Sequence, residues 1–194
     1  DPAPEAHQPM LSPDERWAIA YNGELYNYRE LARDLPQPPR TRSDTEVFLR
    51  ACQAWGPAAF ERFDGMWAAA IVDTAGRTGH LSRDPIGIKP LYYACFDRKL
   101  VFASELATLV ALIEAPLQVD PDAVASYLHL GFIPHPMTIY RHVHKLSPGH
   151  VLRFDANGPT EPHRYWRTTG RATVQIEVPP SYDDACREVR RLLE

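Results

Sequence analysis

A side-chain amide and a glycine stand side by side in AYNGELYNYREL, residues 20–31, at the point where an apolar strand pattern gives way to polar residues. The Asn22 side chain and the Gly23 backbone could supply two N–H donors to an oxygen that becomes negative during acyl transfer. Each such donor contributes about 3–4 kcal/mol in the transition state. The alternative is a tight turn, because Asn-Gly between strands is a strong hairpin signal. A helical pattern follows in place of a second strand, so both interpretations stay open.

Three charged residues are further candidates. Asp44, in RSDTEV, is expected at the first position of a helix, where the helix dipole favours a carboxylate. It could serve only that helix start, or it could pair with the α-ammonium group of an amino-acid substrate. Arg83 and Asp84, in SRDPIGIKPLYY, are expected to end a strand before a glycine-containing turn. Taken alone, they are interpreted as a structural ion pair within a long hairpin.

Neither the histidines nor the cysteines follow a metal-binding pattern. Five histidines fall within 22 residues, but no Asp, Glu or Cys joins them at ligand spacing, so we expect no metal site. They are His129, His135, His142, His144 and His150. The three cysteines, Cys52, Cys95 and Cys186, are odd in number and widely spaced. That spacing argues against a disulfide framework and favours a reducing compartment.

The elements that must position these residues begin with a strand over 16–25 and helices over 27–35 and 43–55. Asn27 is the expected N-cap of the first helix, and Ser43 with Glu46 forms the S-x-x-E capping box of the second.

Four short apolar runs follow, at 66–73, 78–84, 90–97 and 99–104, with connections too short for parallel crossovers. They predict an antiparallel meander. Two more helices are expected at 104–113, with Ser104 as N-cap, and at 120–130, with Asp120 as cap and Pro121 at the first helical position. The pattern predicts an α+β domain.

Bulk composition narrows the function classes. The chain has 194 residues, 44% of them apolar, and a net charge of −4 with no basic block, so nucleic-acid binding is not expected. No apolar run approaches the ~20 residues that a membrane span needs.

We predict a domain over residues 1–166, a linker over 167–180 and the first helix of another domain over 181–194. The helix pattern at the end indicates a chain that continues.

Seven motifs occur in the order found in one known family. They are HQPM, NGELYNYREL, SDTE, FDGMWAAAIVD, RDPIGIKPLYY, FASEL and LHLGFIPHPMTIYRHVHKLSPGH. Together they make residues 7–154 resemble the class II glutamine amidotransferase domain of asparagine synthetases. The resemblance implies an N-terminal-nucleophile hydrolase fold, a four-layer sandwich of antiparallel sheets between helices. We expect this chain to lack the first strands of that fold.

The resemblance implies glutamine hydrolysis to glutamate and ammonia, which is used to amidate aspartate. In the family an N-terminal cysteine thiolate attacks the glutamine carboxamide and its own amine serves as base. By position, Asn22 and Gly23 would form the oxyanion hole, and Glu24 would lie beside them in the glutamine pocket. Asp44 would hold the glutamine α-ammonium group. Arg83 and Asp84 would support that wall.

The family's Cys-Gly-Ile terminus, and the arginine that holds the glutamine carboxylate, would lie before HQPM. None of the three cysteines here is an amino-terminal residue, so we expect the fragment alone to be inactive. The resemblance implies no cofactor in this domain, and ATP and magnesium in the synthetase domain of the same chain. That domain and glutamine are the expected partners, in a cytoplasmic protein that could form a homodimer.

Three other functions remain open on the sequence. The domain could serve an amidotransferase of the same family with another acceptor, or it could be a stand-alone glutaminase. It could also be a non-catalytic relic that binds glutamine as a sensor or scaffold. A native chain that begins with cysteine would favour the enzyme, and a native start near Asp1 would favour the relic.

Overall fold

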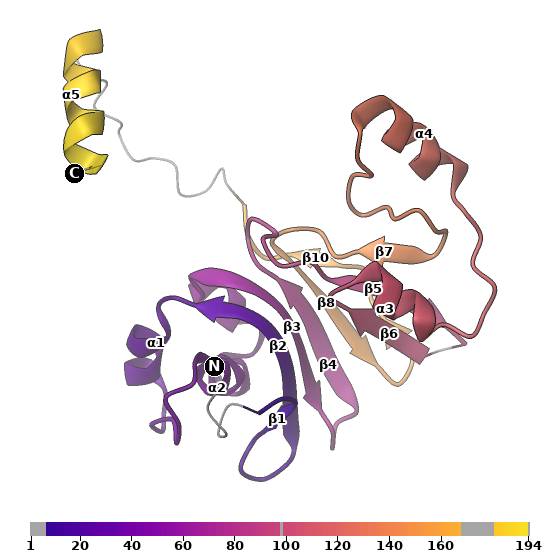
Figure 1. Ribbon diagram of the computed structural model, residues 1–194. Helices are drawn as coiled ribbons and strands as arrows, with labels where there is room; N and C mark the ends of the chain where they lie inside the picture. Colours follow the sequence, from indigo (N-terminus) through magenta and orange to yellow (C-terminus); the bar gives the residue numbers. More distant parts are fainter. Residues whose placement is uncertain (1–6, 98, 168–180, 194) are drawn as a thin grey trace.

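The computed structural model describes residues 7–97, 99–167 and 181–193. Its larger sheet, sheet A, has seven strands in the order β1-β2-β3-β4-β8-β10, with β9 paired to β8 (Figure 1). The strands are β1 (Met10–Leu11), β2 (Trp17–Leu25), β3 (Gly65–Asp73), β4 (Thr78–Arg83), β8 (His150–Asp155), β9 (Gly158–Pro159) and β10 (His163–Arg164). Every pairing in sheet A is antiparallel.

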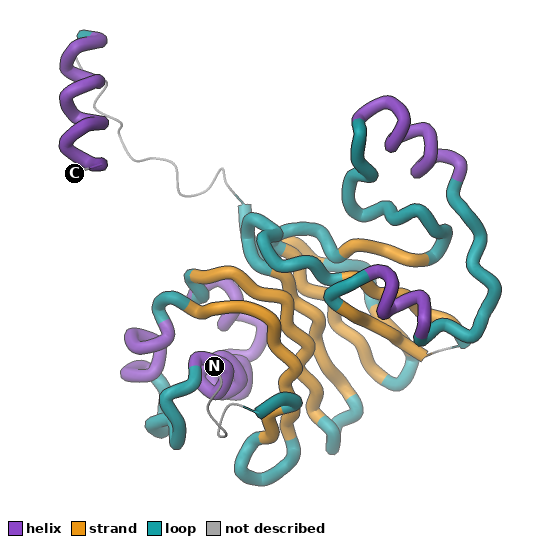
Figure 2. Tube along the Cα trace, in the orientation of Figure 1, coloured by secondary structure: helices purple, strands orange, loops and turns teal. Residues whose placement is uncertain are grey.

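The smaller sheet, sheet B, has three antiparallel strands in the order β6-β5-β7. They are β5 (Tyr92–Phe96), β6 (Lys99–Ala103) and β7 (Val143–Lys145). The helices are α1 (Tyr28–Asp34), α2 (Asp44–Trp55), the 3-10 helix η2 (Gly56–Arg62), α3 (Leu106–Ala111), α4 (Pro121–Leu130) and α5 (Tyr182–Leu193). Figure 2 shows α4 standing apart from both sheets on long loops, and only its Ala123 is buried.

Three apolar clusters stack these elements into layers. The first, with Phe48 and Trp67, lies between α1, α2 and η2 and one face of sheet A. The second, with Leu81 and Leu146, lies between the two sheets, and the third packs Leu109 of α3 onto sheet B. The order helices, sheet A, sheet B, helix is visible in Figure 1 and confirms the predicted four-layer α+β sandwich. No helix among the described residues is long and apolar enough to cross a membrane.

The predicted single meander is wrong. β3 pairs with β4 and β5 pairs with β6, but β4 and β5 belong to different sheets, and β4 takes β8 as its second neighbour. The reason lies in the segment between β4 and β5. It is not a hairpin turn but a loop folded around the buried Asp84 carboxylate, and it carries the chain from sheet A to sheet B.

The predicted capping box of α2 does not form. Ser43 Oγ accepts a hydrogen bond from the Thr45 N–H at 3.3 Å, as an N-cap should. The Glu46 carboxylate instead accepts from the backbone N–H groups of Arg40 and Thr41, at 2.8 and 2.6 Å. Glu46 therefore holds the preceding loop, which offers two unpaired donors, rather than the N-cap backbone.

Two other predicted caps also differ. Asn27 precedes α1, but its side chain makes no cap hydrogen bond and instead bridges the Arg62 carbonyl and the Asp64 N–H. Helix α3 begins after Glu105, so Ser104 is not its N-cap. The cap predicted for α4 is confirmed, since the Asp120 carboxylate accepts from the Asp122 N–H at 3.1 Å.

The end of the chain is described only in part. Helix α5 is present as expected, and Ser181 Oγ accepts from the Asp184 N–H at its start. The predicted linker lies, apart from residue 167, outside the described residues. The division into a domain, a linker and the first helix of another domain stays a prediction.

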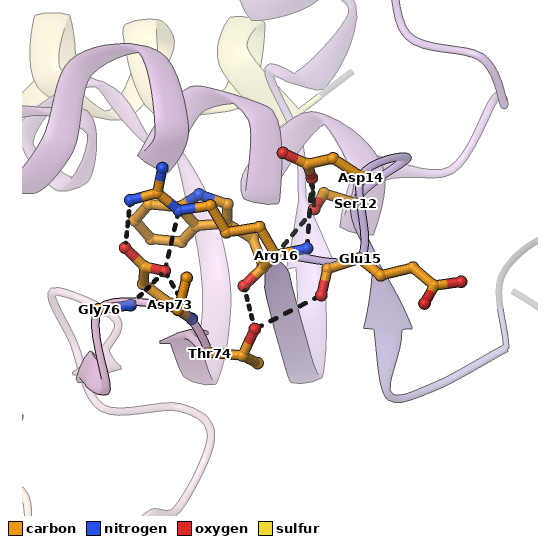
Figure 3. A network of polar contacts seen from close by, with 9 residues as sticks. Ser12, Asp14, Glu15, Arg16, Asp73, Thr74 and Gly76 are labelled. Carbon is orange, nitrogen blue, oxygen red and sulfur yellow. Dashed lines mark hydrogen bonds and ion pairs between the residues drawn. The ribbon is translucent and has the colours of Figure 1, made fainter.

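A polar network ties the start of β2 to the end of β3 (Figure 3). The Arg16 guanidinium donates to both oxygens of Asp73, with Nε–Oδ1 and Nη2–Oδ2 distances of 3.0 and 2.7 Å. Thr74 donates through its hydroxyl and its N–H to the Arg16 carbonyl, each at 2.8 Å. Because Trp17 pairs with Asp73, this network closes the end of the β2–β3 ladder opposite to Asn22 and Gly23.

This contact predicts a pH dependence of stability. The hydrogen bonds from Arg16, followed by that from the Gly76 N–H, lower the pKa of Asp73 to about 2. The contribution of Asp73 is therefore complete above 3.8, the ordinary pKa of the group, and is lost as the pH falls toward 2. We expect the difference in unfolding free energy between wild type and Asp73→Asn to shrink between pH 4 and pH 2 in urea titrations. A difference that stays constant over this range would show that the contact does not act through the ionised carboxylate.

Candidate functional site

Asn22 and Gly23 lie inside strand β2, paired with Ala68 and Trp67 of β3. The pairing continues to Leu25, so the turn interpretation of Asn-Gly is wrong, whereas the strand predicted over 16–25 is confirmed as Trp17–Leu25. The reason is not local. A complete partner strand, 40 or more residues further along the chain, keeps the backbone extended where the dipeptide alone favours a turn.

The outer edge of β2 is open beyond its first residues, because β1 pairs only with Ala18 and Ile19. N–H groups of alternate residues point to the same edge of an antiparallel strand. The Tyr21 N–H points to this outer edge and donates to Gln8 Oε1 at 2.5 Å. The Leu25 N–H does the same and donates to Asp44 Oδ2 at 2.9 Å.

Gly23 lies midway between Tyr21 and Leu25, so by the same alternation its N–H points to the open edge. In the described part of the chain no side chain accepts a hydrogen bond from it. A backbone donor is thus available between two donors that are each capped by a side chain. Since unpaired N–H groups are costly unless water or a ligand satisfies them, this position is suited to receive an oxygen.

Glycine at position 23 also has a packing reason. A Cβ atom there would lie 2.1 Å from the Met66 carbonyl oxygen and 2.7 Å from Trp67 Cα, both backbone atoms of β3. No side chain fits at these distances. The glycine is therefore required by the close approach of two strands, and the support for a donor role comes from the open N–H rather than from the residue type.

An open pocket of about 270 Å³ adjoins the Asn22 side chain, between β2 and β3 on one side and β6 on the other. Its lining is Gln8, Ala20, Tyr21, Asn22, Ala68, Ala69, Ala70, Leu91, Phe102, Ala103 and Ser104. Asn22 Nδ2 lies 3.4 Å from Ser104 Oγ, a long contact that leaves the exposed amide able to turn toward a ligand. Small alanines on β2, β3 and β6 leave this space open, and the polar side chains of Gln8, Asn22 and Ser104 line it.

Gln8 and Ser104 were not predicted as site residues. Both stand in motifs that the resemblance used, HQPM and FASEL, and Ser104 was interpreted as a helix cap. The available signal was a polar residue in each motif that the local structure does not need. Ser104 precedes the N-cap position of α3, and its hydroxyl lies near the Asn22 amide instead.

Asp44 stands at the first position of α2, as predicted, and reaches the open edge of β2. Its Oδ2 atom accepts from the Leu25 N–H and, at 3.4 Å, from the Tyr21 hydroxyl. Burial, and then the Asp44 charge, raise the pKa of Tyr21, so this hydroxyl stays a proton donor. No group in the described residues donates to Asp44 Oδ1, which leaves this oxygen for a cation such as a substrate ammonium group.

Glu24 lies on the same face of β2 as Asn22, because side chains alternate along a strand. It is exposed, and it does not line the pocket. The structure thus places it next to the pocket.

Arg83 and Asp84 do not line the pocket, although Arg83 pairs with the pocket residue Ala68, and both side chains bind backbone groups. The buried Asp84 carboxylate accepts from the N–H groups of residues 86, 87, 88 and 89, at 3.1, 2.6, 3.0 and 3.0 Å. The Arg83 guanidinium donates to the carbonyls of residues 87, 89 and 146, at 2.8, 2.7 and 2.7 Å. Asp84 also exchanges hydrogen bonds with Trp67, which faces Gly23 across the ladder. Trp67 thus links Asp84 to the strand position opposite Gly23.

The cysteines do not supply a nucleophile to this pocket. Cys52 is buried in α2, and burial raises the pKa of its thiol, so it is not a thiolate. Cys95 and Cys186 are exposed on β5 and α5, and neither lines the pocket. Across the described ranges no group of three His, Cys, Asp or Glu side chains is placed to hold a metal ion.

Comparison with known families decides what kind of domain this is. The family model of the glutamine amidotransferase domain matches residues 1–166. The chain belongs to this family.

The glutamine phosphoribosylpyrophosphate amidotransferase from Bacillus subtilis, complexed with ADP and GMP, superimposes with a TM-score of 0.56 at 22% identity. That match covers 84% of this chain and 32% of the other, and it shows a shared N-terminal-nucleophile hydrolase fold.

Curated relatives of this glutamine amidotransferase domain are asparagine synthetases. Asparagine synthetase [glutamine-hydrolyzing] 1 of Bacillus subtilis is 33% identical over 186 residues, which are 94% of this chain and 28% of the relative. Asparagine synthetase [glutamine-hydrolyzing] 3 of the same organism is 30% identical over 185 residues, covering 93% and 29%. The chain thus spans less than a third of the length of these relatives.

Proposed function

We propose that this domain hydrolyses glutamine to glutamate and ammonia within a longer asparagine synthetase. The observation that carries the proposal is the Gly23 N–H, which no described side chain caps and which lies between two capped N–H groups at the strand edge, beside Asn22 in β2. In a chain of the glutamine amidotransferase family, two such donors suit the oxyanion that forms when a carboxamide is attacked. Asp44 Oδ1, at the same edge, suits the α-ammonium group of glutamine.

The reaction in this proposal follows nucleophilic catalysis. A cysteine thiolate adds to the carboxamide carbon, and the oxygen that becomes negative is held by the Gly23 N–H and Asn22 Nδ2. The C–N bond then breaks, the nitrogen leaves as ammonia after protonation, and water hydrolyses the thioester to glutamate. The nucleophile belongs to a part of the longer protein outside these residues, because no described cysteine lines the pocket.

The acceptor half of the activity rests on the relatives' names. We infer that the longer protein uses the ammonia to amidate aspartate, with ATP and Mg²⁺ bound by a synthetase domain of the same chain, in the cytoplasm. Glu24 as a pocket residue, and Arg83 and Asp84 as supporting residues, are part of the same proposal. An acceptor other than aspartate would leave the glutamine site of this proposal unchanged.

The role of Asp44 gives a test of substrate recognition. We expect Asp44→Asn, in the longer protein, to raise KM for glutamine about 10- to 100-fold, the worth of one charge-assisted hydrogen bond. The amide oxygen of Asn can still accept from the Leu25 N–H, so the strand edge is retained. The measurement is glutamate release at varied glutamine concentration.

Glutaramate, which lacks the α-ammonium group, is the control substrate. Wild type should use it as poorly as Asp44→Asn uses glutamine, and Asp44→Asn should lose nothing further on it. If the substitution weakens both substrates by the same factor, Asp44 serves only the helix start and the strand edge. A longer protein that releases no glutamate from glutamine would refute the proposed function itself.

A further inference from the structure

Gln8 is a glutamine side chain already bound at the open edge of β2. Its Oε1 accepts from the Tyr21 N–H at 2.5 Å, across 13 residues of chain. Because the strand offers a donor, the oxygen end of the amide must face it, and the NH₂ end is directed elsewhere. Gln8 also lines the pocket beside Asn22. Its carboxamide oxygen thus accepts a hydrogen bond from the outward N–H of Tyr21. The substrate oxygen would accept in the same way from the next outward N–H, that of Gly23.

The segment of β2 that carries Asn22 and Gly23 has few anchors on its outer side. Strand β1 stops pairing at Ile19, and from there to the end of the strand the described residues hold the edge through side chains. Gln8 fixes it at Tyr21 and Asp44 fixes it at Leu25. The Gly23 N–H lies between these two anchors, so its direction depends on both.

We propose that Gln8 is a positioning residue of the glutamine site, which holds the Gly23 N–H in place for the oxyanion. This inference rests on the proposed function. An oxyanion hole works because its donors are fixed before charge develops, and sub-ångström displacement weakens it. Gln8 also accepts the hydrogen bond of the Tyr21 N–H. The donor left for a substrate oxygen in this segment is therefore the Gly23 N–H.

The test compares Gln8→Met with wild type in the longer protein. Methionine has a similar length and no amide oxygen, so the space stays filled while the Tyr21 N–H loses its acceptor. We expect kcat for glutamate release to fall about tenfold with KM within about twofold of wild type, because only the transition-state contact is weakened. Synthesis from added ammonia should be unchanged. Gln37→Met, the same change at an exposed glutamine in another loop, is the matched control and should leave every rate unchanged.

Backbone hydrogen exchange supplies a second readout. In Gln8→Met the Tyr21 amide should lose protection while the Ile19 amide, bound within the β1–β2 pair, keeps it. Gln8→Glu retains an acceptor oxygen of the same reach and should keep Tyr21 protected.

Three outcomes would overturn the inference. One is a Gln8→Met variant with wild-type kcat, and another is a rise in KM alone, which would make Gln8 a ground-state contact. The third is an equal fall of the ammonia-dependent rate, which would make it a general stabiliser of the fold. A wild-type protein without glutaminase activity would refute the proposed function instead, so the two failures are distinct.

Discussion

Replacing Asn22 by alanine is expected to lower glutamine-dependent turnover of the longer protein about 10²- to 10³-fold, while synthesis from added ammonia continues at the wild-type rate. The side chain is exposed at the pocket, and its hydrogen bond to Ser104 Oγ, the one that it makes with the described residues, is long at 3.4 Å. Its loss therefore removes little from the folded protein and removes one of two donors from the transition state. The measurement is the ratio of glutamine-dependent to ammonia-dependent product formation.

Ser104→Ala is the matched control for this prediction. It removes the partner of Asn22 without removing the donor, so we expect a fall of no more than about fivefold, the worth of one ordinary hydrogen bond. An equal loss of both ammonia-dependent and glutamine-dependent synthesis in Asn22→Ala would show that Asn22 is structural. A loss in Ser104→Ala as large as in Asn22→Ala would show that the serine carries the effect.

Replacing Asp84 by alanine is expected to destabilise the domain by about 3–5 kcal/mol, because a fully buried carboxylate is removed from the donors that surround it. Its two oxygens accept from Trp67 and from the four consecutive N–H groups of residues 86–89. Without the carboxylate, of these loop donors the Gly87 N–H retains a described partner, the backbone carbonyl of residue 84. Urea unfolding of wild type and Asp84→Ala measures the difference.

Asp84→Asn separates the acceptor from the charge. The amide retains one acceptor oxygen, so we expect a smaller loss of stability than for alanine. It still destabilises the loop, because its NH₂ group faces N–H donors. Asp73→Asn is a control at the end of β3 that is far from Trp67. It should lower stability without changing the kinetics with glutamine. If Asp84→Ala unfolds at the same urea concentration as wild type, the carboxylate does not hold the loop and cannot support Gly23 through Trp67.

The sequence predicted the layers better than the connections. Apolar periodicity was sufficient for the α+β class, because each element needs only its own apolar face, whereas the four-layer sandwich was implied by the resemblance that the seven ordered motifs carry. The division of the meander into two sheets was missed, since it depends on the pairing of β4 with β8, about 70 residues away. The carboxylate of Asp84 was visible in the sequence, but the loop that wraps it was not.

The residues of the candidate site could also be predicted only in part from the sequence. Asn22, Gly23 and Asp44 could be named from their motifs, and the structure brings all three to one stretch of β2. Gln8 could be noticed as a polar residue of the motif HQPM, but its role could not be predicted, because that role depends on which N–H groups of β2 are left open by the short strand β1. That is a property of strand register, which local propensity does not determine.

The most direct measurement is a crystal structure of the longer protein with glutamine bound. The site described here predicts that the side-chain carbonyl oxygen of glutamine lies about 2.7–3.1 Å from both Gly23 N and Asn22 Nδ2. The α-ammonium group should lie within hydrogen-bond distance of Asp44 Oδ1. A carbonyl oxygen bound elsewhere, or a Gly23 N–H already taken by another part of the protein, would contradict it.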